Sequence, residues 1–295
     1  MPQRPVQSRS STGVYGVAGH GIGYSLSPHI FRTVFNALRW RADYTLFDIE
    51  KSELRPLLAA MRTAPIRGLN VTKPYKEYII PMLDRLDESA AVVGAVNTVV
   101  REGRRLVGYN TDMAGIIVAL NPSRRRLRGK EALIFGAGGG ARAVAYTLLK
   151  HFGMRGVTIA ARNRARSRRL IHDLQDRMPP ASLASAAFQP AADLSEALAR
   201  ATLVVNATPL GATPSKCASP LPKGTRLRRE TIAFDLVYRP RPTSFSLDAR
   251  RAGCGATIDG WPMLVAQAEA AFRLWTGRGF PPAVRRDLMK ARKLP

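Results

Sequence analysis

Two residues in the first half of the chain, Lys76 and Asp112, could move a proton. Hydride reduction of a carbonyl creates an alkoxide that needs a proton. A lysine ammonium can stabilise that oxygen and supply the proton, and a nearby carboxylate can hold the lysine. The sequence leaves open whether the two side chains meet, since Lys76 could be a surface lysine and Asp112 a helix N-cap.

Polar side chains follow several expected strands of the first half, where each strand meets a loop. In open parallel sheets, ligands bind at the carboxyl ends of strands. Hydroxyl and amide groups suit a polyhydroxylated substrate, because each can donate or accept a hydrogen bond. Singly, these residues could be caps or turn residues, but together they indicate a substrate site. They are Ser25, Ser27, Asn70, Thr72, Asn97, Thr98 and residues 110–112.

A glycine-rich turn divides an apolar strand from a helix in residues 132–150. The turn reads Gly136-Ala137-Gly138-Gly139-Gly140 and continues with Ala141. Strand, glycine turn and helix form the context in which this spacing indicates dinucleotide binding, with the pyrophosphate at the helix N-terminus. A glycine turn that only connects the two elements is the alternative.

In a nucleotide-binding domain, residues at the end of the next strand, here residue 160, bind the adenosine ribose of the cofactor. An acidic residue there would bind the 2′-hydroxyl of NAD. This chain has Arg162, Asn163, Arg164 and then Arg168, with no acid before Asp173. Guanidinium groups favour the extra 2′-phosphate of NADP. Exposed helix arginines in an arginine-rich protein are the alternative interpretation.

The composition indicates a basic protein of two ordinary domains. The chain has 295 residues, with 46 Lys and Arg against 21 Asp and Glu. Nucleic-acid binding is one interpretation of this charge, but no nucleic-acid motif accompanies it, so we expect small-molecule ligands and no specific nucleic acid. We expect no membrane span and no secretory signal, and we interpret the first dozen residues as a disordered tail.

The cysteines and histidines suggest neither a metal site nor a disulfide framework. Cys217 and Cys254 form no metal spacing, and two cysteines in so long a chain suit a reducing cytoplasm. The four histidines show no zinc spacing either. We therefore expect a cytoplasmic protein without a metal.

Alternating strands and helices must position these residues, which predicts α/β domains with parallel or mixed sheets. Ser27 and Ser52 are expected to cap two helices, and a further helix is expected to end at Leu120. We expect strands at 14–18, 44–47, 68–72, 94–100, 105–108, 132–135, 156–160, 203–206, 232–235 and 255–258. Later helices are expected at 165–178 and 264–275, with loops at 121–130, 178–190 and 213–222.

The chain resembles the shikimate dehydrogenase family over residues 14–277. Motifs of that family occur in the expected order along the whole of this segment. The matching stretches are residues 25–28, 70–76, 94–98, 108–112, 136–140, 163–164 with 168, 206–209, 235–238, and 260–264 with 267–268.

The resemblance implies an N-terminal mixed or parallel α/β substrate domain at 13–112 and a Rossmann-type NADP-binding domain at 113–260. C-terminal helices at 261–295 would return to the substrate domain. The implied reaction is the reversible reduction of 3-dehydroshikimate to shikimate with NADPH, in aromatic biosynthesis. Monomer and homodimer are both compatible with it.

The resemblance also assigns roles residue by residue. Lys76 and Asp112 would form the catalytic pair. Ser25 and Ser27 would bind the substrate carboxylate, and Asn70, Thr72, Asn97, Tyr238 and Gln267 would line the remaining substrate site. The cofactor would contact Gly136, Ala137, Gly138, Gly139, Gly140, Asn163, Arg164, Arg168, Leu236 and Gly260.

Some positions depart from the family pattern. The loop at 20–24 lacks the expected proline-containing turn and the histidine before Ser25, and Ala165 stands where the family usually has threonine. A quinate/shikimate dehydrogenase of the same family therefore remains an alternative. A second alternative is a non-catalytic binding or regulatory protein that retains the NADP fold.

Overall fold

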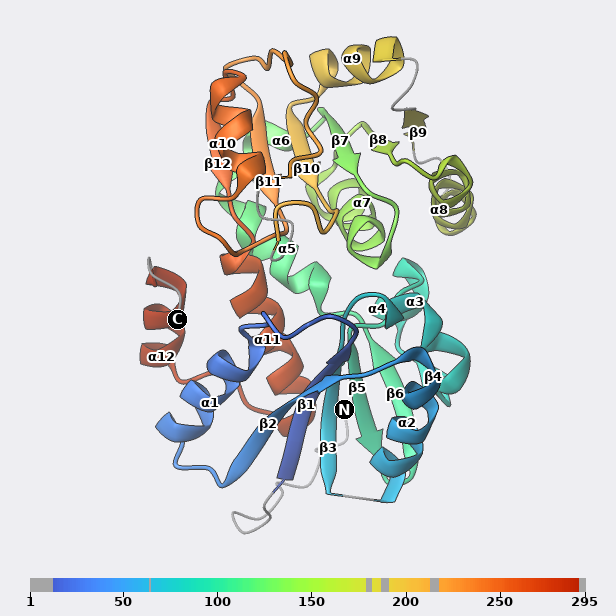
Figure 1. The fold of residues 1–295 in the computed structure, drawn as a ribbon, viewed down its shortest axis with the longest axis vertical. Coiled ribbons are helices and arrows are strands. Elements are labelled where there is room, and N and C mark those ends of the chain that lie inside the picture. The colour runs from blue at the N-terminus through green and yellow to red at the C-terminus, as the bar shows by residue number, and fades with distance from the viewer. Residues whose placement is uncertain (1–12, 64, 179–181, 187–190, 213–217, 292–295) are drawn as a thin grey trace. The chain divides into compact units, whose positions relative to one another are not determined.

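The computed structural model describes residues 13–63, 65–178, 182–186, 191–212 and 218–291. Contacts divide the chain into two compact units (Figure 1). Unit 1 contains Met1–Ala114 and Leu264–Pro295, and unit 2 contains Gly115–Met263. The expected tail at 1–12 lies outside the described residues. Within the described residues, no helix has the length and apolar character that crossing a membrane requires.

Unit 1 is built on a mixed six-stranded sheet in the order β2-β1-β3-β5-β6-β4. Parallel pairing joins β1 to both β2 and β3, whereas β5 runs antiparallel to β3 and β6. This arrangement brings the carboxyl ends of β1 and β3 to one edge of the sheet. The strands are β1 (Gly13–Gly19), β2 (Ala42–Asp48), β3 (Ile66–Val71), β4 (Arg85–Leu86), β5 (Thr98–Glu102) and β6 (Arg105–Tyr109).

Helices cover both faces of this sheet. On one face, α2 (Leu54–Thr63) buries Leu54, Leu58 and Met61 against the strands, and α3 (Tyr75–Tyr78) and α4 (Glu88–Val93) join the same cluster. On the other face, aromatic rings from α1 (Ser27–Ala37) and α11 (Trp261–Thr276) surround Tyr15. Two further helices are α5 (Asp112–Leu120) and α12 (Pro282–Lys290).

Trp275 ties α11 to the sheet of unit 1. Its indole N–H donates to the Val99 carbonyl at 3.0 Å, and its ring lies against Gly68. A side chain at Gly68 would overlap the indole, so the glycine allows this close approach. The C-terminal part of the chain thereby completes the core of the N-terminal unit.

The two predicted serine caps are wrong. Ser27 is the first residue of α1 and Leu26 precedes it, while the Ser25 hydroxyl accepts the Ser27 amide at 3.3 Å. Ser52 lies inside a short 3₁₀ turn, Lys51–Glu53, which Glu50 and Glu53 cap reciprocally. A glutamate carboxylate can accept a hydrogen bond from a backbone amide, just as a serine hydroxyl can. The capping box formed by Glu50 and Glu53 therefore replaces the serine cap that the sequence predicted.

The strand expected at 94–100 begins only at Thr98. Gly94 ends α4 in the left-handed region at φ +70°, which glycine adopts without steric cost. Residues 95–97 then lead from the helix into β5.

Unit 2 is built on a parallel six-stranded sheet in the order β12-β11-β10-β7-β8-β9, the strand order of a Rossmann fold. The expected α/β fold with a mixed sheet and a Rossmann-type sheet is confirmed. Its strands are β7 (Glu131–Phe135), β8 (Gly156–Ala160), β9 (Ser182–Ala186), β10 (Leu203–Asn206), β11 (Ile232–Asp235) and β12 (Ala256–Ile258).

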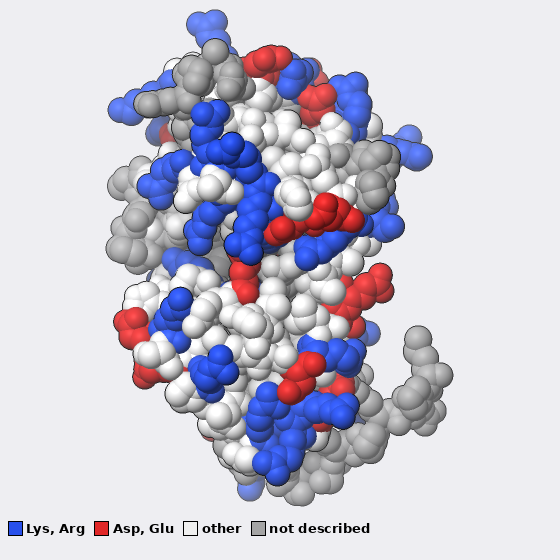
Figure 2. Space-filling model, turned by 90° about the vertical axis from the view of Figure 1, so that its right-hand side faces the viewer, with Lys and Arg blue, Asp and Glu red and all other residues white. Residues whose placement is uncertain are grey.

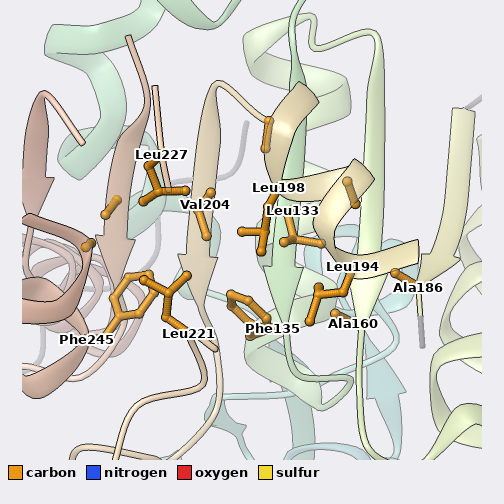
Figure 3. Packing of buried hydrophobic residues seen from close by; sticks show 14 residues of the cluster. Leu133, Phe135, Ala160, Ala186, Leu194, Leu198, Val204, Leu221, Leu227 and Phe245 are labelled. Carbon is orange, nitrogen blue, oxygen red and sulfur yellow. The ribbon is translucent and has the colours of Figure 1, made fainter. Parts of the chain in front are cut away.

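One face of this sheet is covered by α9 (Ala191–Arg200) and α10 (Ser244–Arg251). Figure 3 shows Leu198 of α9 close to Leu133 of β7, and Leu194 of α9 close to Ala160 of β8, within one buried cluster. Phe245 of α10 belongs to the same buried cluster. The helices α7 (Gly139–Phe152) and α8 (Arg164–Arg177) contact β7 and β8.

Several elements of unit 2 were not predicted. The expected loop at 121–130 contains a 3₁₀ turn at Asn121–Ser123 and the short helix α6 (Arg124–Leu127), in which only Leu127 is buried. The described part of the expected loop at 178–190 contains β9, whose small residues carry no apolar alternation. The loop expected at 213–222 lies partly outside the described residues. Short or weakly apolar elements give no periodic signal, so only tertiary packing defines them.

Candidate active site

Lys76 and Asp112 form an ion pair inside unit 1. Lys76 lies on α3, just after β3, and Asp112 is the first residue of α5. The Lys76 ammonium donates to Asp112 Oδ2 at 2.5 Å. The side chains are 19% and 5% exposed, respectively, so the lysine retains the greater access to a ligand. The sequence predicted the two residues as candidates without showing that they meet.

Asn97 fixes the orientation of Asp112. Its Oδ1 atom accepts the Thr111 amide at 2.7 Å and the Thr98 hydroxyl at 3.1 Å. The amide group therefore has one orientation, in which Nδ2 donates to Asp112 Oδ1 at 2.8 Å. Each oxygen of the Asp112 carboxylate thus has its own donor, Asn97 on one side and Lys76 on the other.

Gln267 and Asn70 extend this network to α11 and β3. Gln267 Oε1 lies 3.5 Å from both Asn97 Nδ2 and the Thr111 hydroxyl. Asn70 Nδ2 donates to the Asn97 carbonyl at 3.2 Å, and Asn70 Oδ1 accepts the Tyr44 hydroxyl at 2.7 Å. Four predicted residues from distant parts of the sequence are therefore brought together around Asp112: Lys76, Asn70, Asn97 and Gln267.

Tyr44 was expected only as a strand residue, and its part in the site was not predicted. It is buried, and its ring stacks on Phe31 at a centroid distance of 4.2 Å. The stack fixes the phenol so that its hydroxyl orients Asn70. A single tyrosine in a strand gives no sequence signal for this role, because its partner lies 26 residues away.

Thr72 directly follows β3, and Ser25 lies in the loop between β1 and α1. The loop after β1 is held by Asp48, whose carboxylate accepts the amides of Gly21 and Ile22. The Thr72 amide donates to the Ala18 carbonyl, and its methyl group faces Gly19. Among the described residues, no hydrogen bond links Ser25, Ser27 or Thr72 to the Asp112 network. The predicted substrate residue Tyr238 belongs to unit 2.

The glycine turn of unit 2 has the features that a pyrophosphate site requires. Gly136 adopts φ +112°, and a Cβ there would meet the Ala207 carbonyl at 2.9 Å. A Cβ at Gly138 would enter open space. Gly138 precedes α7 without a side-chain cap, which leaves the first N–H groups of a 14-residue helix available to an anion.

Arginines at the start of α8 follow the carboxyl end of β8. The Asn163 side chain caps α8 by accepting the Arg166 amide at 3.1 Å. Arg164 and Arg168 are exposed. Figure 2 shows many basic side chains on the side of the molecule where α8 lies in Figure 1. The first acid that follows these arginines is Asp173. Its Oδ2 atom accepts a hydrogen bond from Arg142 Nη2 of α7 at 2.7 Å, so this carboxylate already has a cationic partner.

Asp235 anchors the loops that follow β10 and β11, a role the sequence did not predict. It is fully buried. Its Oδ1 atom accepts Asn206 Nδ2 and the Val237 amide, both at 2.9 Å, and its Oδ2 atom accepts the Thr243 hydroxyl at 2.6 Å. Burial raises the pKa of Asp235 to about 7, although the donors Thr243, Val237 and Asn206 each lower it.

These loops place Leu236 and Gly260 beside the glycine turn. A Cβ on Gly140 would lie 3.2 Å from Leu236 Cδ2. A Cβ on Gly260 would overlap the Leu236 carbonyl, so a glycine is needed for this approach of two loops. The predicted cofactor residues Gly136–Gly140, Leu236 and Gly260 thus lie at one edge of the parallel sheet.

Comparison with known proteins relates both units to one family. The model of the shikimate dehydrogenase substrate binding domain matches residues 17–99, and that of the shikimate 5'-dehydrogenase C-terminal domain matches residues 260–290. A shikimate dehydrogenase (NADP(+)) from Salinibacter ruber is 42% identical over 96% of this chain and 98% of its own length.

Solved structures agree with this relationship. Shikimate 5-dehydrogenase from Thermus thermophilus, in complex with NADP(H) and shikimate, has a TM-score of 0.79 and 35% identity over 95% of this chain and 99% of that chain. Quinate dehydrogenase from Corynebacterium glutamicum, in complex with NAD, has a TM-score of 0.81 and 29% identity over 94% and 98% of the two chains. Identity above 30% over nearly the whole length places this chain in the shikimate dehydrogenase family.

Proposed function

We propose that this chain is an NADP(+)-dependent shikimate dehydrogenase that reversibly reduces 3-dehydroshikimate to shikimate, a step of aromatic amino acid biosynthesis. The observation that carries the proposal is the Lys76–Asp112 ion pair within a network of amide and hydroxyl groups. Membership of the family supplies the identity of the substrate.

Lys76 acts on the substrate oxygen. Its ammonium stabilises the negative charge that develops when the ketone is reduced, and it supplies the proton that completes the hydroxyl. Asp112 holds the ammonium in place and balances its charge, and Asn97 holds Asp112. In the reverse direction, Lys76 accepts the hydroxyl proton as hydride leaves the carbon.

The remaining polar residues hold the substrate. Ser25 and Ser27 bind the carboxylate through their hydroxyl groups. Asn70, Thr72, Asn97, Tyr238 and Gln267 line the site for the ring hydroxyls. The hydrogen bonds among Asn70, Asn97 and Gln267 support this role, because they fix the amide orientations before a substrate arrives.

The residues of unit 2 fit NADP(H), which supplies the hydride when bound. Residues 136–140 hold the pyrophosphate at the N-terminus of α7. Asn163, Arg164 and Arg168 bind the 2′-phosphate, and the absence of an acid at that position in the sequence disfavours NAD. Leu236 and Gly260 would contact the nicotinamide end of the cofactor.

This function assigns a role to each part of the chain. Residues 13–112 and 261–295 form the substrate domain, and residues 113–260 form the NADP-binding domain. We place the enzyme in the cytoplasm, as a monomer or homodimer, on the basis of its family and its two cysteines.

Quinate is the alternative substrate, and the similarity to a quinate dehydrogenase favours testing it. Quinate carries one more hydroxyl group than shikimate. An assay of the absorbance of reduced nicotinamide would compare shikimate and quinate, each with NADP(+) and with NAD(+). Turnover confined to shikimate and NADP(+) is the expected result. Comparable turnover with quinate would assign the chain to the dual-specificity branch.

Lys76→Met tests the mechanism, because it keeps most of the unbranched side chain and removes the ammonium. We expect kcat to fall about 10²–10⁴-fold, the range for a lost general acid. NADP(+) affinity, measured by fluorescence titration, should remain unchanged. Near-normal turnover of the variant would refute the role of Lys76, and absence of turnover in the folded wild-type protein would favour a non-catalytic binding protein.

A further inference from the structure

A second basic region of unit 2 lies away from the glycine turn. An open pocket of about 420 Å³ is bounded by α6 and by the last turn of α7. We call it the basic pocket; its lining residues are Arg124, Arg125, Arg128, Lys150, His151, Phe152 and Gly153. Because α7 begins in the glycine turn and ends at this pocket, the two are separated by the 14 residues of the helix, or about 21 Å.

The charges of the basic pocket are not balanced by acids. Its lining contains three arginines, a lysine and a histidine, and no Asp or Glu. Within the described part of the chain, Arg124, Arg125, Arg128 and Lys150 form no ion pair. The first acid after Arg128 in the sequence, Glu131, is bound by Arg155 and Arg200. Mutual repulsion of these cations is relieved when an anion binds among them.

Packing against Phe152 holds the Arg124 guanidinium in place at the basic pocket. The Arg124 guanidinium lies over the Phe152 ring, with 5.3 Å between Cζ and the ring centroid, and Phe152 is buried. The Gly129 amide donates to the Gly153 carbonyl, which joins the two chain segments beneath the pocket. Neither glycine places a side chain into the space.

The pKa of His151 is lowered by the surroundings of the basic pocket. The residue is half-buried, and burial lowers its pKa, with further lowering by the charges of Arg124 and Lys150. A neutral imidazole adds a hydrogen-bond group without adding to the repulsion.

We propose that the basic pocket binds a small anion carrying several phosphates, at a site separate from the NADP site. Guanidinium forks bind phosphate oxygens in pairs, and cations from two helices can contact adjacent phosphates. Inorganic polyphosphate and the triphosphate of a nucleotide share this chemistry. A single phosphate would contact only part of a pocket of this volume.

Calorimetric titration of the full-length protein with tripolyphosphate tests the proposal, with saturating NADP(+) present to fill the other phosphate site. We expect binding of one equivalent at about 150 mM salt, where weak surface attraction is screened. The variant Arg124→Gln/Lys150→Gln should weaken binding about tenfold or more, since each charge-assisted contact contributes strongly. A parallel titration with ATP distinguishes a nucleotide from inorganic polyphosphate as the preferred ligand.

Two further variants make the result specific. Arg226→Gln/Arg229→Gln removes two exposed charges from unit 2 outside the pocket and should change affinity less than twofold. Arg125→Gln/Lys150→Gln leaves the Arg124–Phe152 stack intact, so it remains informative if the first variant fails to fold.

Three results would overturn the proposal. The first is no binding to the wild-type protein, and the second is equal weakening by the pocket and control variants, which would show attraction to net charge alone. The third is displacement of tripolyphosphate by a duplex DNA whose binding depends on the same residues, which would identify a nucleic-acid surface instead.

Discussion

Replacing Asp235 by asparagine should make the stability of the protein less dependent on pH. Burial raises the pKa of the Asp235 carboxyl from 3.8 to about 7 in the folded state. Between these two values the folded protein keeps the proton and the unfolded chain loses it. Unfolding therefore releases a proton, and the free energy of unfolding falls as pH rises toward 7.

The size of the effect follows from the two pKa values. Each pKa unit corresponds to about 1.4 kcal/mol, so two units between pH 5 and pH 7 amount to about 3 kcal/mol. An asparagine side chain can still accept the Asn206 and Val237 donors through its one oxygen, and the Thr243 hydroxyl can rotate to accept from its amide. The Asp235→Asn variant should therefore gain about 3 kcal/mol relative to wild type from pH 5 to pH 8.

Urea unfolding followed by circular dichroism at pH 5, 6, 7 and 8 measures this difference. Asp235→Ala provides the contrast, since it removes the carboxylate that accepts three buried hydrogen bonds and should destabilise at every pH by about 3 kcal/mol or more. A difference between wild type and Asp235→Asn that stays constant across these pH values would refute the raised pKa. Equal behaviour of the asparagine and alanine variants would refute the anchoring role of the hydrogen bonds.

Three further predictions concern the site and the core. Asn97→Ala removes the donor that orients Asp112 and should lower kcat about tenfold to a hundredfold in steady-state assays, whereas loss of substrate affinity alone would contradict this role. Arg164→Gln/Arg168→Gln should raise the KM for NADP(+) at least tenfold and leave that for NAD(+) within about twofold, because only NADP(+) carries the 2′-phosphate; parallel increases would contradict the assignment. Trp275→Ala should lower the free energy of unfolding by about 3–5 kcal/mol in urea titrations through the cavity it leaves, and an unchanged midpoint would count against its role in joining α11 to the sheet.

The sequence by itself determined the local elements with strong periodic or conformational signals. The apolar strand at 132–135, the glycines after it and the helix that follows are specified by neighbouring residues, because a tight turn requires glycine at Gly136. Lys76 and Asp112 were identified as candidates because few side chains can move a proton. Alternating strand and helix patterns predicted the α/β fold class, and the order of the family motifs predicted how the chain is divided into domains.

Only the tertiary structure decided which residues meet. The Lys76–Asp112 contact joins residues 36 positions apart, and Gln267 reaches Asn97 across 170 positions. Such contacts depend on strand order and helix packing, which local patterns do not encode. The predicted Ser52 cap was wrong because the turn begins earlier than expected, at Lys51, where Glu50 and Glu53 cap each other's backbone amides.

Asp235 is the clearest example of a residue whose position the sequence predicts and whose contacts only the tertiary structure decides. Its position at the end of a buried strand could be read from the sequence, but its three donors come from Asn206, Val237 and Thr243, which only the folded loops bring together. Its raised pKa is a consequence of burial, and burial is a property of the packed unit rather than of any local stretch of residues.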